Sequence, residues 1–286
     1  RSGEEAEDLS GYQTVILMAG TLTGGQNPRL ALSVSNTQKQ VMETATASGQ
    51  TVLLGISGQS GVLKSTAVAT AVAEALTDSS YDGVYLNIAL AAFVQALRAA
   101  VPEKKLYVAA SAPARREAIP DYQALGKAAD RIVLQVSGHE DTDGAVPVYA
   151  MEPLETVYYA LSALNDQIPG EKLALLLRAE GHGRKGTGKP TAFSGDTVAA
   201  LEAKGRTYYS DRYACAYLET KDTVVWYLNE KALEARQQLL RCFGEFKVLC
   251  DKKKVVSDAD IEALVSHSDR AETIENGYKL DWFAVH

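Results

Sequence analysis

Continuous apolar runs recur along the chain and alternate with segments whose apolar residues have helical spacing. A strand that is apolar along its whole length, rather than at every second residue, is typical of a parallel sheet covered on both faces. Strands are therefore predicted at residues 14–22, 51–58, 83–90, 105–113, 131–138, 172–181 and 245–250. Helices are predicted at residues 35–49, 65–79, 91–102, 122–129, 153–169, 229–244 and 257–267.

The repeated strand–helix order predicts an α/β fold with a parallel sheet. In a chain of 286 residues, this number of repeats favours a (β/α)8 TIM-type barrel over an open sheet. An eighth strand must come from residues 277–285 or from the N-terminal region, or it is absent. The barrel is therefore expected to be incomplete or to have an atypical first or last strand. The polar segment between the 172–181 strand and the 229–244 helix receives no predicted element.

The first residues differ in composition from the rest. Residues 1–11 are acidic and rich in small side chains, which predicts a disordered linker or a remnant of cloning. Residues 12–286 are expected to form a single domain. No signal peptide is recognised in residues 1–11, which fits a cytosolic protein and equally a secreted protein trimmed to its mature domain, so export stays open.

Composition excludes some partners. The formal net charge is −7 and both signs are scattered along the sequence, whereas a general nucleic-acid binder needs a basic surface. The longest apolar runs are shorter than the roughly 20 residues of a membrane span, so no membrane insertion is expected. The sequence leaves the oligomeric state open.

No cofactor or metal is expected. The glycine-rich loop at residues 55–66 resembles a phosphate-binding loop, but Val62 and Leu63 separate Gly61 from Lys64 and break the required spacing. The four histidines form no pair with the spacing of metal ligands, and the three cysteines have no CxxC spacing. The histidines are His139, His182, His267 and His286.

Three longer stretches resemble a known family. They are "DYQALGKAADRIVLQVSG" (121–138), "PLETVYYALSALNDQIPGEKLALLL" (153–177) and "VVWYLNEKALEARQQLLRCFG" (224–244). In order and spacing they are similar to glycoside hydrolase family 18, and most of all to its bacterial spore-cortex and cell-surface branch. That branch acts on polymers containing N-acetylglucosamine. The resemblance covers about residues 50 to 250 and implies the barrel fold and a secreted or cell-surface location.

The family's catalytic signature is altered in this chain. The strand that reads Asp-Gly-x-(Asp or Asn)-x-Asp-x-Glu in the family corresponds to residues 82–89. Asp82 and Gly83 match, but Tyr85, Asn87 and Ala89 occupy the acidic positions. Because side chains alternate along a strand, these three residues are expected to share the inward face. The resemblance places the general acid at Ala89 and the aspartate that orients the acetamido group at Asn87.

A second family motif is altered in the same way. The Met-x-Tyr-Asp that follows the sixth strand corresponds to Gln135, Val136, Ser137 and Gly138. In this family the acetamido oxygen of the substrate is the nucleophile, but the enzyme must still protonate the leaving oxygen. General acid catalysis alone contributes about 10² to 10⁴-fold. The usual hydrolysis is therefore not expected, and no residue is assigned a catalytic role.

Two other interpretations stay open. Tyr85, Asn87 and Ala89 can simply pack the interior, with Gln135 or Ser137 as hydrogen-bond partners of Asn87. Alternatively, catalysis has moved to another carboxylate near a strand end. The candidates are Glu180, Glu152, Glu140, Asp141 and Asp143, of which Glu180 and Glu152 are favoured.

The leading hypothesis is a pseudoenzyme that binds N-acetylglucosamine-containing glycan, such as peptidoglycan or a chitin-like polymer, or serves as a cell-envelope scaffold. The alternatives are an active hydrolase with relocated carboxylates, and a structural or protein-interaction domain without a sugar site. The segment "TYYSDRY" (207–213) supplies aromatic side chains of the kind that stack on sugars, or forms an ordinary surface cluster. The expected ligand-binding residues are Tyr85, Asn87, Ala89, Gln135, Ser137 and Glu180.

Overall fold

A computed structural model of the protein describes residues 9, 11–23, 29–58, 66–77, 79–87, 89–112, 120–136, 150, 152–164, 167–178, 180–241 and 247–251. The chain divides into two compact units. The first unit comprises Arg1–Leu134 and Gln167–Lys172, and the second comprises Gln135–Asp166 and Leu173–His286. Several predicted features lie outside the described residues: most of the 1–11 linker, the candidate carboxylates Glu140, Asp141 and Asp143, the helix 257–267 and the possible eighth strand 277–285. The prediction of a single domain over 12–286 stays a prediction.

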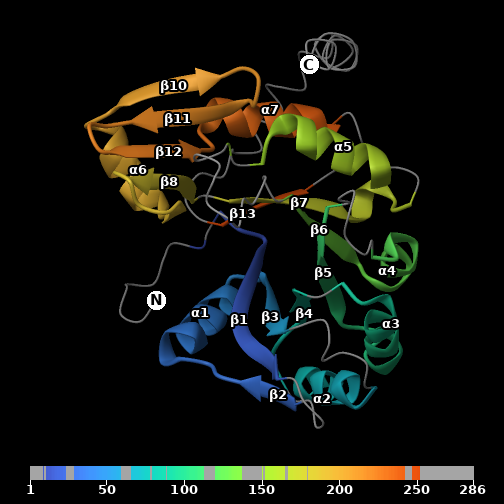
Figure 1. The fold of residues 1–286 in the computed structure, drawn as a ribbon. Helices are drawn as coiled ribbons and strands as arrows, with labels where there is room; N and C mark the ends of the chain where they lie inside the picture. The colour runs from blue at the N-terminus through green and yellow to red at the C-terminus, as the bar shows by residue number, and fades with distance from the viewer. Residues whose placement is uncertain are drawn as a thin grey trace. The chain divides into compact units, whose positions relative to one another are not determined.

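The first unit is a sheet with helices, and it follows the predicted order (Figure 1). Its strands run in the order β6-β5-β4-β3-β1-β2. The strands β1, β3, β4 and β5 are parallel, as predicted, and β2 pairs with β1 in the antiparallel sense. The strands are β1 (Thr14–Thr23), β2 (Arg29–Leu32), β3 (Thr51–Gly58), β4 (Gly83–Leu86), β5 (Lys105–Ser111) and β6 (Arg131–Gln135). The helices are α1 (Asn36–Ala47), α2 (Thr66–Thr77), α3 (Ala91–Ala100), α4 (Tyr122–Ala128) and the 3-10 turn η2 (Gly170–Lys172).

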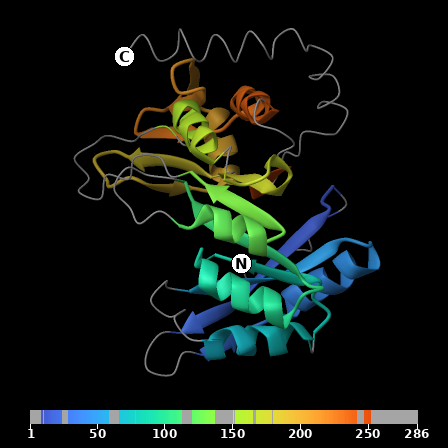
Figure 2. The ribbon, with the colours of Figure 1, turned by 90° about the vertical axis from the view of Figure 1, so that its right-hand side faces the viewer.

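Side-chain caps and apolar faces fix the helices of this unit. Ser35 caps α1, where its hydroxyl accepts from the backbone N–H of Gln38, and the Gln38 side chain accepts from Ser35 N–H. The Asp121 carboxylate caps α4 by accepting from Ala124 N–H. Helix α3 packs against both α2 and α4, and these three helices lie side by side in two views (Figures 1 and 2). Its buried face consists of Phe93, Val94 and Leu97.

Two aspartates act as backbone clamps at the amino ends of parallel strands. The carboxylate of Asp82, just before β4, accepts from Val52 N–H at 2.8 Å, and Asp82 N–H donates to Val52 O at 2.9 Å. Asp130, just before β6, makes the same pair of bonds to Leu106, at 2.7 Å and 2.9 Å. The family-like Asp82–Gly83 step is therefore structural here. A Cβ atom on Gly83 would collide with the backbone oxygen of Lys105.

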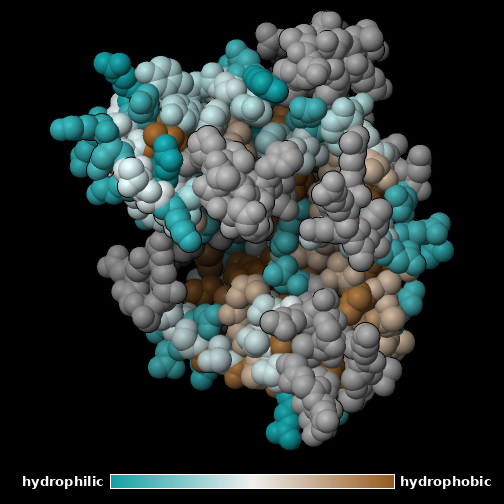
Figure 3. All heavy atoms as spheres, viewed as in Figure 1, coloured by the Kyte–Doolittle hydropathy of each residue, from teal (hydrophilic) through white to brown (hydrophobic). Residues whose placement is uncertain are grey.

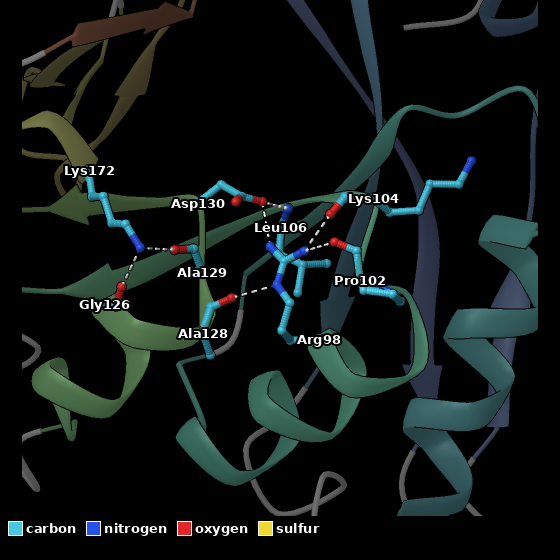
Figure 4. A network of polar contacts seen from close by, with 9 residues as sticks. All are labelled: Arg98, Pro102, Lys104, Leu106, Gly126, Ala128, Ala129, Asp130 and Lys172. Carbon is cyan, nitrogen blue, oxygen red and sulfur yellow. Dashed lines mark hydrogen bonds and ion pairs between the residues drawn. The ribbon is translucent and has the colours of Figure 1, made fainter.

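A cationic network joins the second of these clamps to the ends of α3 and α4 (Figure 4). Arg98 donates to the Asp130 carboxylate at 2.5 Å and to three backbone oxygens, those of Ala128, Pro102 and Lys104, each at 2.9 Å. Lys172 of η2 donates to the backbone oxygens of Gly126 and Ala129 at the end of α4. The bonds to Gly126, Ala128 and Ala129 satisfy carbonyl groups at the end of α4 that a helix end leaves without intrahelical partners.

The substitution Asp130→Ala is expected to lower the free energy of unfolding by about 2 kcal/mol, because it removes both the Leu106 bond and the charge-assisted Arg98 bond. Asp82→Ala is the matched control, since it removes the same kind of backbone bond without an arginine, and about 1 kcal/mol is expected. Urea unfolding measures both values. Equal losses in the two variants would show that the Arg98 contact contributes nothing.

Within the described residues, the second unit contains a parallel strand pair, the helices α5, α6 and α7, and a separate antiparallel sheet (Figure 1). Strand β7 (Leu173–Arg178) pairs in parallel with β13 (Lys247–Asp251), and helix α5 (Leu154–Leu164) packs against α7 (Glu230–Arg241). The second sheet has the strand order β10-β11-β12-β8-β9. Its elements are β8 (Gly181–Lys185), β9 (Thr191–Phe193), α6 (Gly195–Glu202), β10 (Arg206–Ser210), β11 (Cys215–Glu219) and β12 (Thr223–Tyr227).

This second sheet fills the segment that received no predicted element. Its strands are three to five residues long and mix polar with apolar positions, so they lack the continuous runs that identified the parallel strands. One face packs on a core of Val198, Ala216, Leu218, Val225 and Tyr227, with Val198 contributed by α6. The Tyr227 hydroxyl donates to Glu202 of the same helix. The sheet therefore has its own small core.

No helix among the residues that the structure describes is long and apolar enough to cross a membrane.

Candidate functional site

The signature positions lie at and just beyond the end of β4. The predicted strand 83–90 is too long, because β4 ends at Leu86 and helix α3 begins at Ala91. The apolar run Ile88–Ala92 continues from the loop into the helix, so hydrophobicity alone could not locate the strand end. Asn87 is exposed, and its backbone N–H still donates to Ile56 O at 3.0 Å. Ala89 is half-buried in the loop. The alternation rule therefore does not place Asn87 and Ala89 on the face of Tyr85.

Tyr85 is a packed side chain in this structure. It is 8% exposed, and its register partners are Gly55 on β3 and Tyr107 on β5. Partners in neighbouring strands share a face, so Tyr85 and Tyr107 lie side by side, and the guanidinium of Arg131 lies 5.4 Å from the centre of the Tyr107 ring. These contacts favour the packing interpretation for Tyr85, whereas Asn87 and Ala89 are accessible.

The remaining predicted ligand residues belong to the second unit. Gln135 is the last residue of β6 and is half-buried, and Ser137 lies outside the described residues. Glu180 is exposed in the bend between β7 and β8. Tyr85, Asn87 and Ala89 therefore lie in the first unit, whereas Gln135 and Glu180 lie in the second.

A cluster of three charged residues, two of them buried and one exposed, forms where three segments of the second unit meet. Glu152 precedes α5, Arg178 ends β7 and Arg236 lies on α7. Glu152 is 2% exposed, and its Oε1 lies 3.4 Å from Arg178 Nε. Arg236 is fully buried and donates to the backbone oxygen of Glu152. The other carboxyl oxygen, Glu152 Oε2, is buried without a hydrogen-bond partner among the residues described.

Burial is the largest influence on the pKa of Glu152 in this cluster. Loss of solvent raises the pKa of Glu152 from its ordinary 4.5 to about 7, against the opposing charges of Arg178 and Arg236 and a backbone hydrogen bond from Arg178. A carboxyl group with such a pKa exchanges a proton near neutral pH, as a general acid must. Because Glu152 is almost fully enclosed, the described geometry gives it no open contact with a substrate.

Only part of this cluster was found from the sequence. Glu152 was a candidate because it is a carboxylate near a strand end, but Arg178 and Arg236 were not singled out. The signal for Arg236 is its spacing: Ala232, Arg236 and Leu240 recur every four residues, so the arginine shares the buried face of α7. The backbone of Glu152 has φ 38°, a left-handed conformation that is rare for a side chain of this kind.

Comparisons with known proteins identify the fold. No protein-family model and no curated protein matches the chain. Among solved structures, the chain is similar to a glycoside hydrolase family 18 N-acetylglucosaminidase from Paenibacillus barengoltzii, with 15% identity over 92% of this chain and 95% of the other and a TM-score of 0.70.

Two plant proteins match over a similar length. A chitinase-like agglutinin from Robinia pseudoacacia shares 17% identity over 93% of this chain and 94% of its own, with a TM-score of 0.69. A class V chitinase from Nicotiana tobaccum, in complex with NAG4, shares 14% identity over 86% of this chain and 90% of its own, with a TM-score of 0.68. These matches confirm the resemblance at the level of fold: the chain has the α/β fold of the family 18 chitinases.

Proposed function

We propose that the protein binds a glycan containing N-acetylglucosamine without hydrolysing it. The observation that carries the proposal is the chemistry at the carboxyl end of β4. The position of the family's general acid is Ala89, and the position of the acid that orients the substrate is Asn87. In parallel α/β folds this end of the strands is where ligands bind. An exposed asparagine there can hydrogen-bond an acetamido group but cannot protonate a leaving oxygen.

The fold supports this assignment. The same fold occurs in a chitinase-like agglutinin and in a chitinase that binds NAG4. On this proposal, the ligand is peptidoglycan or a chitin-like polymer and the protein is secreted or displayed at a bacterial cell surface.

Hydrolysis through Glu152 is the second candidate, favoured by one observation. A pKa of about 7 suits a general acid at neutral pH, and Glu152 stands near the carboxyl end of β7. Its 2% exposure is the argument against it, since a general acid must reach the leaving oxygen. Glu180 is accessible but belongs to an exposed bend.

Calorimetric titration of the full chain with chito-oligosaccharides and peptidoglycan fragments tests the proposal, with turnover assayed on the same samples. We expect saturable binding and no released sugar. Asn87→Ala is expected to weaken binding about twofold to tenfold, the equivalent of one hydrogen bond. Asn36→Ala, at an exposed asparagine at the start of α1, is the matched control.

Each other outcome selects an alternative. Sustained hydrolysis that is lost in Glu180→Ala or Glu152→Gln would establish a hydrolase with relocated acids. Absence of binding to every sugar would leave a structural or protein-interaction domain.

A further inference from the structure

One face of the five-stranded sheet presents a row of aromatic side chains. Tyr208 of β10 lies opposite Tyr217 of β11, which in turn lies opposite Trp226 of β12. Directly opposite residues of antiparallel strands share a face, so the three rings form one row across three strands. The ring centroids are 6.2 Å apart for Tyr208–Tyr217 and 4.9 Å apart for Tyr217–Trp226. We call this the aromatic face.

The aromatic face is not the side of the sheet that packs on α6. The neighbouring positions Ala216, Leu218 and Val225 point to the opposite side, where they form the core with Val198. On the aromatic face, Tyr208 is 48% exposed, and Tyr217 and Trp226 are half-buried. The Tyr213 ring meets the Trp226 ring edge-on at 5.8 Å and holds it in place. The accessible rings are therefore those of Tyr208 and Tyr217.

Charged side chains border this row on one side. Arg206 of β10 and Glu219 of β11 lie two residues from Tyr208 and Tyr217 on the same strands, and so on the same face. Arg184 of β8 is the register partner of Val224, two residues before Trp226, and it shares this face. All three charged residues are exposed. Arg206 is the direct partner of Glu219 across β10 and β11. Burial raises the pKa of the Tyr217 hydroxyl, Glu219 raises it further, and Arg184 lowers it, so both signs of charge act on this hydroxyl. The surface over these strands mixes hydrophilic residues with residues of intermediate hydropathy (Figure 3, upper left).

We propose that the aromatic face binds a neutral oligosaccharide, whose pyranose rings stack on Tyr208 and Tyr217 while their hydroxyl or acetamido groups bond to the charged border. A pyranose ring has an apolar C–H face and a polar rim, and the aromatic face offers rings beside both donors and acceptors. Single-stranded nucleic acid also stacks on aromatic rings, but it requires a cationic groove. Glu219 and the net charge of −7 oppose that ligand.

The choice of N-acetylglucosamine as the sugar rests on the proposed function, whereas the class of neutral glycan rests on the aromatic face itself. The chain has two tryptophans, so Trp282→Phe leaves Trp226 as the fluorescent reporter at this face. Titrations of this full-length variant use chitohexaose, cellohexaose and hexathymidylate as probes.

Chitohexaose is expected to change the Trp226 emission saturably. Tyr208→Ala and Tyr217→Ala should each raise its Kd about tenfold. Tyr208→Phe keeps the ring and should stay within about threefold of the parent Kd. Tyr159→Ala is the matched control, because Tyr159 is an exposed tyrosine of α5 at 55% exposure and lies off this sheet. If Tyr217→Ala fails to fold, the comparison of Tyr208→Ala with Tyr208→Phe still tests the proposal, because Tyr208 is exposed.

The outcomes separate this inference from the proposed function. If chitohexaose binds by calorimetry but the ring variants keep the parent affinity, the aromatic face is excluded and the proposed function stands. If only cellohexaose binds and its binding depends on Tyr208, the aromatic face stands and the proposed function fails. Binding of neither sugar, or of hexathymidylate alone, overturns both.

Discussion

Replacing Arg236 with methionine is expected to lower the free energy of unfolding of the second unit by about 4 kcal/mol. The Arg236 guanidinium is fully buried and donates to Ala214 O at 2.6 Å, to Ala232 O at 2.8 Å and to Glu152 O. Methionine fills a similar volume but donates no hydrogen bond. Two buried carbonyl groups outside the helix then lose a donor, and each such loss costs about 1–3 kcal/mol.

Arg236 also holds two strained turns. Glu152 has φ 38° and Ala214 has φ 47°, and among the described residues these are the non-glycine positions with positive φ. Both present their carbonyl oxygen to the same guanidinium. A non-glycine residue in this region costs about 1–3 kcal/mol and persists where the surroundings hold it. Arg236 therefore offsets backbone strain in two segments far apart in the sequence.

Chemical unfolding followed by Trp226 emission, in a Trp282→Phe background, measures this effect. Arg236→Lys keeps the charge but lacks the forked donor geometry, so an intermediate loss is expected. Ala214→Gly tolerates the left-handed backbone and should recover about 1 kcal/mol in the Arg236→Met background. A loss below about 1 kcal/mol for Arg236→Met would contradict the assigned role.

Glu152→Gln is expected to stabilise the protein at alkaline pH by about 3 kcal/mol and to have little effect at pH 4. The folded protein raises the pKa of Glu152 from 4.5 to about 7 because the carboxyl is buried. Between these pH values the folded protein holds this proton more tightly than the unfolded chain does. The stability that the proton provides is therefore fully present below about pH 4.5 and is lost as the pH rises through about 7.

Glutamine is neutral at every pH and resembles the protonated acid in shape. It gives up the ion pair with Arg178, but the Arg178 side chain is 45% exposed and remains solvated. Urea unfolding at a series of pH values from 4 to 9 measures the difference between the variant and the parent. Glu180→Gln is the control: Glu180 is exposed, and a change below about 0.5 kcal/mol is expected. A difference that does not grow with pH would rule out a buried Glu152 with a raised pKa.

The two predictions also bear on function. Glu152 and Arg236 lie at the junction of α5, β7 and α7, where Arg236 supports the backbone of Glu152 and Ala214 and the buried Glu152 carboxyl makes stability depend on pH. A group that only supports this junction changes stability and its pH dependence, whereas a general acid also changes turnover. Destabilisation by Arg236→Met and stabilisation by Glu152→Gln at alkaline pH, without any hydrolysis in the parent protein, would agree with the proposed glycan-binding role.

The sequence predicted the parallel strands because each has a continuous apolar run. The predicted strand 51–58 has the bounds of β3, and the predicted 14–22 strand differs from β1 by one residue. Such runs are reliable signals where both faces of a strand are covered, since every position is then buried. In β4 all residues from Gly83 to Leu86 are buried.

The sequence did not predict where the candidate site residues Asn87 and Ala89 lie relative to the end of β4. Asn87 and Ala89 were assigned to a strand because the apolar run continues into α3, and only the start of that helix shows where β4 ends. The short strands of the second sheet mix polar and apolar residues, because one face packs on α6 while the other carries both packed residues, such as Cys215, and exposed ones, such as Tyr208. Their pattern has no continuous run to detect.

By itself, the sequence predicted the order of the parallel strands and helices and the family likeness, and the replacement of the signature acids by Tyr85, Asn87 and Ala89 stays a prediction. These follow from local composition and from positions along the chain. The tertiary structure decided which distant residues meet: Glu152 with Arg178 and Arg236, and Tyr208 with Tyr217 and Trp226. Burial, strained turns and strand register arise from contacts between segments far apart in the chain, so no local pattern specifies them.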